Sequence, residues 1–171
     1  MSEANSTQLP IDAPERRRLP PLLRRSWYGL NQAFRRRITH LKVTPDQFTV
    51  LRTLIEGDVK GLSQREIAET ISSDPNTIAS LLERMEANDL VERTTHESDR
   101  RAHRIRLLPQ GRKTYKIARA LALELQSEVL SALPENQREG FLQHLALVAD
   151  ACHRAAEKSP KTRKSGTRSV A

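Results

Sequence analysis

The chain has 171 residues, of which 37% are apolar and only 4% aromatic, which predicts one domain with a helical core of Leu, Ile, Val and Ala rather than a β-sandwich. No window approaches the roughly 18 consecutive apolar residues of a membrane-spanning helix, and the single cysteine, Cys152, excludes an internal disulfide. We therefore expect an intracellular, cytoplasmic protein without a membrane partner.

The charge of the chain is large and unevenly distributed. The 29 Lys and Arg residues against 21 Asp and Glu give a net charge of +8. Residues 15–42 carry +8 and residues 91–116 carry +5, whereas residues 43–90 between them carry −5. Basic blocks of this kind are typical of proteins that bind a polyanion, although solvated surface charge gives the same pattern.

Both ends of the chain lack the periodicity of helices and strands. We predict a disordered N-terminal arm over residues 1–19 and a disordered basic tail over residues 159–171, with one domain over residues 20–158. The domain is expected to begin with a helix from Pro20 to Ile38, because apolar residues recur there at helical spacing. These residues are Leu22, Leu23, Trp27, Leu30, Phe34 and Ile38.

Three well-marked helix starts follow. Thr44-Pro45-Asp46-Gln47 and Ser63-Gln64-Arg65-Glu66 are capping-box patterns, in which the first side chain accepts a hydrogen bond from the fourth amide and the fourth side chain reaches back. Asp74-Pro75 marks the third start. The first helix should end near Gly57 and the second near Ser72. The third should bury Ile78, Leu81, Leu82 and Met85 and leave outside Asn76, Thr77, Ala79, Ser80, Glu83 and Arg84.

The pattern then changes to one that predicts a hairpin and two long helices. In residues 90–107, polar and apolar residues alternate on either side of a charged loop, which indicates a two-stranded hairpin with a basic tip. Helical spacing returns after Pro109, with Tyr115, Ala118, Leu121, Leu125, Val129 and Leu133 on one side. A last helix begins at Pro134, with Phe141, Leu142, Leu145, Val148 and Cys152 on one side. The predicted fold class is therefore mainly α with a small β-hairpin wing.

Two short helices joined by a tight turn and followed by a hairpin form a winged helix-turn-helix. The second helix of such a pair fits the major groove of DNA, and the hairpin, or wing, reaches an adjacent groove or the backbone. Asn can pair with adenine there, and Ser and Thr can reach base edges or phosphates. Only Arg84 is positive on the outward face, so the wing and the first helix should supply most of the affinity.

The run from about His40 to Arg112 resembles the MarR family of bacterial transcriptional regulators. The resemblance is most specific where Asp99-Arg100-Arg101 is followed by Ile105-Arg106-Leu107 and then Gly111, which is similar to the family's wing sequence. It also includes Leu41-Lys42-Val43-Thr44-Pro45-Asp46-Gln47-Phe48, Leu62-Ser63-Gln64-Arg65-Glu66-Ile67-Ala68, Thr77-Ile78, Leu81-Leu82-Glu83-Arg84-Met85-Glu86 and Leu90-Val91-Glu92-Arg93.

The resemblance implies a homodimer that binds an inverted-repeat operator in double-stranded DNA. Residues 40–112 would form the DNA-binding core, and residues 20–39 and 113–158 the dimerisation helices. Asp99 would brace the wing through a salt bridge, and Arg101 would enter the minor groove. The implied DNA contacts are Ser63, Asn76, Thr77, Ala79, Ser80, Arg84, Arg100 and Arg101.

Two positions depart from the family's pattern. Asp89 stands where these proteins usually have Gly at the end of the recognition helix, but Asp tolerates a left-handed conformation better than most residues. Leu108 stands where Thr commonly caps the helix before Pro109. The loss of this cap costs about 1 kcal/mol, so the sequence does not fix the exact start of that helix.

Three other groups of residues allow a functional and a plainer interpretation. Trp27, Tyr28 and Tyr115 are candidates for binding a small aromatic effector beside the first, second and fifth helices, although packing explains each of them as well. Cys152 is a candidate for oxidation, but its place on an apolar stripe favours inert packing. The set His96, Asp99 and His103 matches no compact metal motif, so we predict no metal site.

The leading hypothesis is a ligand-responsive, sequence-specific DNA-binding homodimer that acts as a transcriptional repressor. An enzyme is disfavoured because the chain has no phosphate loop, nucleophile elbow or visible acid–base arrangement, and no cofactor is expected. The alternative is a winged-helix protein-interaction module without specific DNA binding, which the acidic residues 43–90 keep open.

Overall fold

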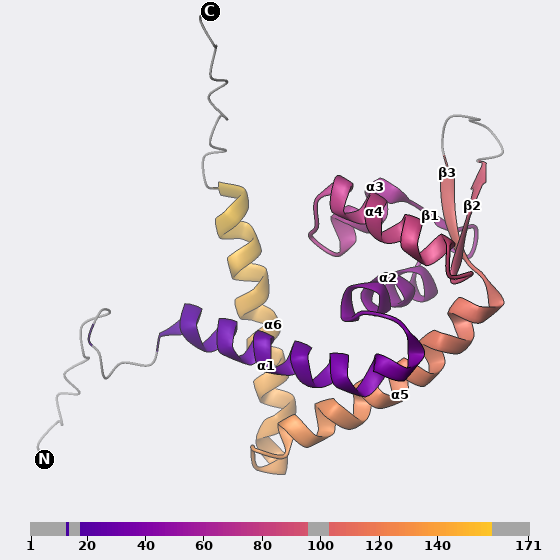
Figure 1. Cartoon of the computed structure of the whole chain (residues 1–171). Coiled ribbons are helices and arrows are strands. Elements are labelled where there is room, and N and C mark those ends of the chain that lie inside the picture. Colours follow the sequence, from indigo (N-terminus) through magenta and orange to yellow (C-terminus); the bar gives the residue numbers. More distant parts are fainter. Residues whose placement is uncertain (1–12, 14–17, 96–102, 159–171) are drawn as a thin grey trace, which may run out of the picture. The chain divides into compact units, whose positions relative to one another are not determined.

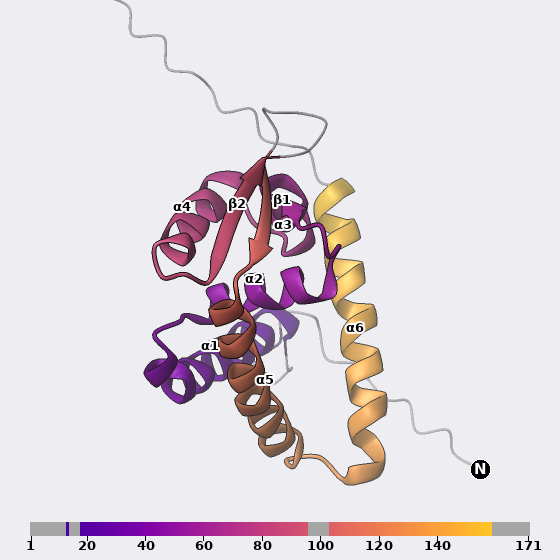
Figure 2. The ribbon, with the colours of Figure 1, turned by 90° about the vertical axis from the view of Figure 1, so that its right-hand side faces the viewer.

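The computed structural model describes residues 13, 18–95 and 103–158 (Figures 1 and 2). Its contacts divide the chain into two compact units, residues 1–125 and residues 126–171. The elements are α1 (Leu19–Ile38), the 3-10 helix η1 (Thr39–Leu41), α2 (Pro45–Glu56), β1 (Leu62–Ser63), α3 (Gln64–Thr70), α4 (Pro75–Glu86), β2 (Val91–Thr95), β3 (His103–Leu107), α5 (Pro109–Leu130) and α6 (Glu135–Lys158).

The predicted helix starts coincide with the observed ones because the capping side chains make their hydrogen bonds. At the start of α2, Thr44 Oγ1 accepts from the Gln47 amide at 3.2 Å, and the Gln47 side chain accepts from the Thr44 amide at 2.9 Å. α3 ends two residues earlier than Ser72, the predicted limit, and Ser72 itself has a positive φ of 54°. A left-handed residue cannot continue a right-handed helix.

The core of the first unit lies between α2, α3, α4 and the sheet. All four residues predicted to point inward from α4 are buried, and they join a cluster that includes Leu51 of α2 and Ile67 of α3. In Figures 1 and 2, α2 lies between α1 and the α3–α4 pair. Burying one such aliphatic side chain contributes about 1.5–3 kcal/mol, so this cluster fixes the position of α4.

A three-stranded antiparallel sheet, in the order β1-β3-β2, forms the wing and its base. The hairpin was predicted, and β2 pairs with β3 from Val91 opposite Leu107 outward. The short strand β1 was not predicted. It pairs Leu62 with Ile105, and Gly61 before it has a φ of 92°, where an added Cβ would lie 2.5 Å from the Ile105 carbonyl oxygen. Gly61 therefore permits the close approach of β1 to β3.

The long helices leave much of their predicted apolar stripes uncovered. In α1 only Phe34 and Ile38 are buried, whereas Trp27 and Leu30 are exposed. No residue of α6 is buried. The side chain of Cys152, which is expected to pack on the apolar stripe of this helix, is exposed in the single chain, as are Phe141 and Leu145 of the same stripe. No helix in the described ranges is long and apolar enough to cross a membrane.

Candidate nucleic-acid interface

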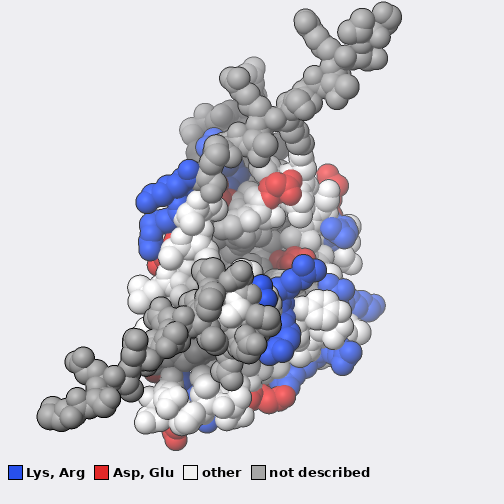
Figure 3. Space-filling view, turned by 90° about the vertical axis from the view of Figure 1, so that its left-hand side faces the viewer, with Lys and Arg blue, Asp and Glu red and all other residues white. Residues whose placement is uncertain are grey.

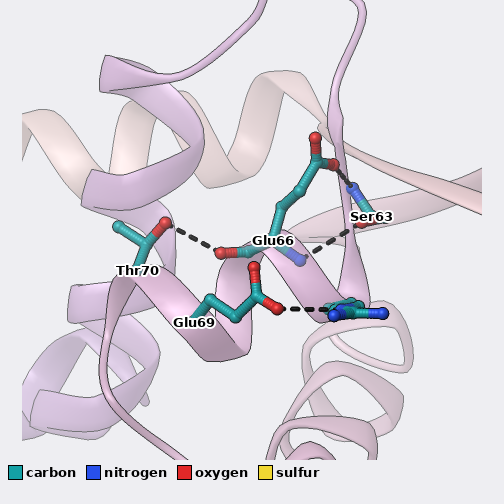
Figure 4. Close-up of polar contacts among 5 residues, drawn as sticks. Ser63, Glu66, Glu69 and Thr70 are labelled. Carbon is teal, nitrogen blue, oxygen red and sulfur yellow. Dashed lines mark hydrogen bonds and ion pairs between the residues drawn. The ribbon is translucent and has the colours of Figure 1, made fainter. Parts of the chain in front are cut away.

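The start of α3 is held by two reciprocal hydrogen bonds (Figure 4). Ser63 Oγ accepts from the Glu66 amide at 3.2 Å, and Glu66 Oε2 accepts from the Ser63 amide at 2.6 Å. The hydrogen bonds from the Ser63 backbone and side chain lower the pKa of the Glu66 carboxyl. The Ser63 hydroxyl still has its own proton to donate, which is compatible with the predicted phosphate contact.

Two further interactions join exposed side chains of α3 to other residues of the same helix. Arg65 Nε lies 2.8 Å from Glu69 Oε1, and the Thr70 hydroxyl donates to the Glu66 carbonyl at 2.8 Å (Figure 4). The Arg65–Glu69 pair is exposed, so its contribution to stability is small. It does, however, neutralise an arginine that would otherwise be free to reach phosphate.

The first turn of α4 is capped by Asp74. Its Oδ1 accepts from the amides of Asn76 and Thr77 at 3.0 Å each, and its Oδ2 accepts from the Thr77 hydroxyl. These hydrogen bonds, that of the Thr77 hydroxyl most strongly, lower the pKa of Asp74. The amides that could have bound a phosphate therefore already have an acceptor. Thr77 offers its methyl group and a lone pair rather than a donor.

The outward face of α4 carries the side chains predicted to read DNA. Asn76, Thr77, Ser80 and Arg84 are exposed, while Ala79 is half-buried, so its predicted position fully outside the apolar stripe is corrected. Arg84 Nε donates to the Ser80 carbonyl at 3.1 Å. This hydrogen bond orients the guanidinium along the helix and leaves its terminal nitrogens for other acceptors.

Both ends of α4 are tied to neighbouring elements by contacts that the sequence did not predict. Gln64 Nε2 donates to the Pro75 carbonyl at 2.9 Å. Arg93 Nε of β2 lies 3.3 Å from Glu86 Oε2, an ionic contact without hydrogen-bond geometry, and Arg93 Nε and Nη2 are shielded from solvent. The only sequence signal for the second contact is the opposite charge of two residues on either side of a turn.

That turn contains Asp89, the residue that replaces the family's usual Gly. Asp89 has a φ of 54°, so it adopts the left-handed conformation that was expected for this position. Its amide donates to the Glu86 carbonyl at 3.0 Å, and the Leu90 amide donates to the Met85 carbonyl at 3.0 Å. The chain thus leaves α4 and enters β2 through a well-bonded turn.

The wing strands carry three arginines in different environments. Arg93 faces Glu86, and Arg104 Nη1 donates to the Gly61 carbonyl at 2.5 Å, which fastens β3 to the segment before β1. Arg106 is exposed. The tip of the wing lies outside the described residues, and with it His96, Asp99, Arg100 and Arg101, while for His103 only the backbone is described. Among the residues that are described, no group of three His, Cys, Asp or Glu could hold a metal ion.

The predicted effector residues are not gathered at one place. Trp27 and Tyr28 are 62% and 66% exposed. Tyr115 instead stacks on Phe48, with ring centroids 5.7 Å apart, and the rings of Phe48 and Phe34 meet in an edge-to-face arrangement with centroids 4.9 Å apart. α1, α2 and α5 therefore meet at this aromatic cluster. The predicted meeting point beside Trp27 is wrong, because only the last turns of α1 are covered.

On the face drawn in Figure 3, blue basic side chains lie beside white uncharged ones.

Comparisons with known proteins agree with this geometry. The model of the MarR family matches residues 43–103. The regulator HosA of Escherichia coli is 30% identical over 101 residues, which are 59% of this chain and 73% of HosA. The repressor CouR, solved with a 23-mer DNA duplex, is 30% identical with a TM-score of 0.69, and the match covers 75% of this chain and 89% of CouR.

The chain belongs to the MarR family. The MarR-family match begins at Val43 and ends at His103, so it contains α2, β1, α3, α4 and β2 and stops at the first residue of β3. The regulator BilQ of Clostridium symbiosum is 34% identical over 83 residues, 48% of this chain, but the chain spans only 58% of BilQ. MepR of Staphylococcus aureus, solved with DNA, shares the fold with a TM-score of 0.73 at 22% identity, over 80% of this chain and 99% of MepR.

Proposed function

We propose that this MarR-family chain is a sequence-specific double-stranded DNA-binding transcriptional regulator, a ligand-responsive repressor that acts as a cytoplasmic homodimer without catalytic activity. The observation that carries the proposal is that α4 has a buried apolar side and an exposed polar side. Its four large aliphatic residues Ile78, Leu81, Leu82 and Met85 are buried, while Asn76, Ser80 and Arg84 stand exposed on a helix that is capped at its start and tied at both ends. A rigid helix with such a face suits base readout in the major groove.

The relatives support both parts of this proposal. CouR, at 30% identity, was solved with a DNA duplex, and CouR from Rhodococcus jostii, at 28% identity, was solved with p-coumaroyl-CoA. An effector of this chain would then be an aromatic acid or a derivative of one. Binding near the Phe34–Phe48–Tyr115 cluster would move α1 and α5 relative to α2, and so would shift the population of chains competent to bind DNA.

One experiment separates reading of bases from attachment to the backbone. Sites recovered by genomic footprinting supply an operator duplex, which is compared with a scrambled duplex at several salt concentrations. Asn76→Ala should cost about 1–3 kcal/mol on the operator and little on scrambled DNA. Arg101→Ala, by the family resemblance of the wing, should weaken both and reduce the salt slope by about one.

The control is Asn136→Ala on α6, which removes the same side chain far along the sequence from α4. Equal affinity of the wild-type chain for operator and scrambled duplexes would contradict the proposal. That result would favour the alternative, a protein-interaction module, which the net charge of the two reading helices supports: residues 64–86 contain two basic and five acidic residues.

A further inference from the structure

The helices that would read DNA do not carry the charge needed to hold it. α3 and α4, with the turn between them, have a net charge of −3. Arg65 is paired with Glu69, and Asp74 places a carboxylate at the start of α4. Duplex DNA presents about one negative charge per 1.7 Å of its axis, and neutralising these charges supplies most of the non-specific affinity. Basic side chains outside the helix-turn-helix must therefore supply the attraction.

The first half of α5 provides such a group. Between Pro109 and Leu123 the helix has four basic residues and no acidic one. All four are exposed, and none has an ion pair with a residue that the structure describes. They are Arg112, Lys113, Lys116 and Arg119, called here the α5 basic face.

The α5 basic face points away from the core. Gly111, Thr114 and Ala118 are the buried residues of this half of the helix. Arg112, Lys116 and Arg119 follow the i, i+4, i+7 spacing that places side chains on one side of a helix, and all three are on its exposed part. At a rise of 1.5 Å per residue the face extends for about 10 Å, a length over which duplex DNA presents about six phosphate charges.

The start of α5 is fastened rigidly to the base of the wing. α5 begins at the foot of the β2–β3 hairpin (Figures 1 and 2). The Leu108 amide donates to the Leu90 carbonyl at 3.1 Å. A Cβ added to Gly111 would lie 2.1 Å from the same carbonyl oxygen, so helix and turn are in direct backbone contact. The α5 basic face therefore keeps a fixed position relative to the base of the wing.

We propose that the α5 basic face is a phosphate-anchoring surface for the duplex DNA that flanks the site read by α4 and the wing. The inference rests on the proposed function, since it assumes that DNA is the partner. It assigns the anchoring to charge rather than sequence, because Lys and Arg on an exposed helix contact phosphates without reading bases.

The test uses the full chain and a 40-base-pair duplex of mixed sequence, titrated at several salt concentrations. Replacing Arg112, Lys116 and Arg119 together by Gln should make the slope of log K against log[salt] shallower by about 2–3, since each neutralised phosphate contributes about 0.9. A second variant, Arg112→Lys with Arg119→Lys, keeps the charge and should keep the slope.

A matched control removes three exposed basic residues outside α1, the wing and the α5 basic face, namely Arg52, Arg154 and Lys158, by the same change to Gln, and should make the slope shallower by less than one. An unchanged slope in the α5 variant, or an equal loss in the control, would overturn the proposal. The proposed function is tested separately by the preference of the α5 variant for operator over scrambled DNA, which should remain as in the wild-type chain.

Discussion

The side-chain amide of Gln64 donates a 2.9 Å hydrogen bond to the main-chain carbonyl of Pro75, and so joins the first residue of α3 to the first residue of α4. Pro75 is followed directly by Asn76 and Thr77, the first side chains on the proposed DNA-reading face. Gln64 thus acts as a positioning residue, since its side chain holds the start of the proposed reading helix.

Replacing Gln64 by Met keeps the length of the side chain but removes the donor. A neutral hydrogen bond contributes about 0.5–1.5 kcal/mol, so affinity for the operator should fall about 2- to 10-fold, while affinity for scrambled DNA stays the same. The measurement is the ratio of the two affinities. Gln126→Met, on the exposed side of α5, is the control and should leave the ratio unchanged. An unaltered ratio in Gln64→Met would show that α4 is positioned by its core contacts alone.

The contact between Glu86 and Arg93 should couple the end of α4 to the wing. Arg93 Nε and Nη2 are shielded from solvent, and the side chains of Glu86 and Arg93 are only 43% and 30% exposed. The pair should therefore contribute more to stability than a fully exposed salt bridge does. A double-mutant cycle with Glu86→Gln and Arg93→Gln should give a coupling of about 0.5–1 kcal/mol in urea unfolding. The exposed pair of Arg65 and Glu69 is the reference, and an equal coupling there would refute the stronger role of Arg93.

The sequence predicted contacts between residues that are near neighbours along the chain and missed contacts between residues that are far apart along it. The capping boxes were visible because donor and acceptor lie three residues apart, and local backbone geometry then brings them together. Gln64 and Pro75 are 11 residues apart, and Leu62 pairs with Ile105 across the whole helix-turn-helix. Such contacts depend on how elements pack, which no local pattern encodes.

The aromatic cluster shows the same limit. The apolar stripe of α1 was correct in its spacing, but the spacing does not say which part of a stripe is covered. α2 and α5 reach only the Phe34 end, so Trp27 and Tyr28 stay exposed. Asp89, in contrast, was predicted correctly because a positive φ is a property of one residue and its turn.

Acid should weaken the start of α4. The pKa of Asp74 is lowered in the folded chain by the hydrogen bonds it accepts, first from the Thr77 hydroxyl. A carboxyl with a lowered folded pKa adds stability above its unfolded pKa, near 3.9, and loses it as the pH falls through the folded value. Asp74→Asn keeps an amide acceptor without titrating, so the unfolding free energy should fall less steeply below about pH 4.

The matched control for this titration is Asp150→Asn, on the exposed side of α6. It should keep the acid dependence of the wild-type chain, measured by urea unfolding at several pH values. The same dependence in Asp74→Asn and the wild-type chain would show that the cap contributes nothing that depends on its charge.

The uncovered side of α6 predicts that a second chain is required. No residue of this helix is buried, and Phe141, Leu145 and Leu147 are 44%, 38% and 64% exposed. A 24-residue helix with an apolar side is poorly stable alone in water, and a homodimer in which the same helices pack together would cover it. Leu145→Glu places a charge at the centre of that side, so it should shift the chain towards monomer in sedimentation at micromolar concentration.

Gln143→Glu adds the same charge at an exposed polar position and should leave the dimer intact. A dimer that survives Leu145→Glu unchanged would place the interface on the exposed part of α1 instead, where Trp27→Glu is the corresponding variant.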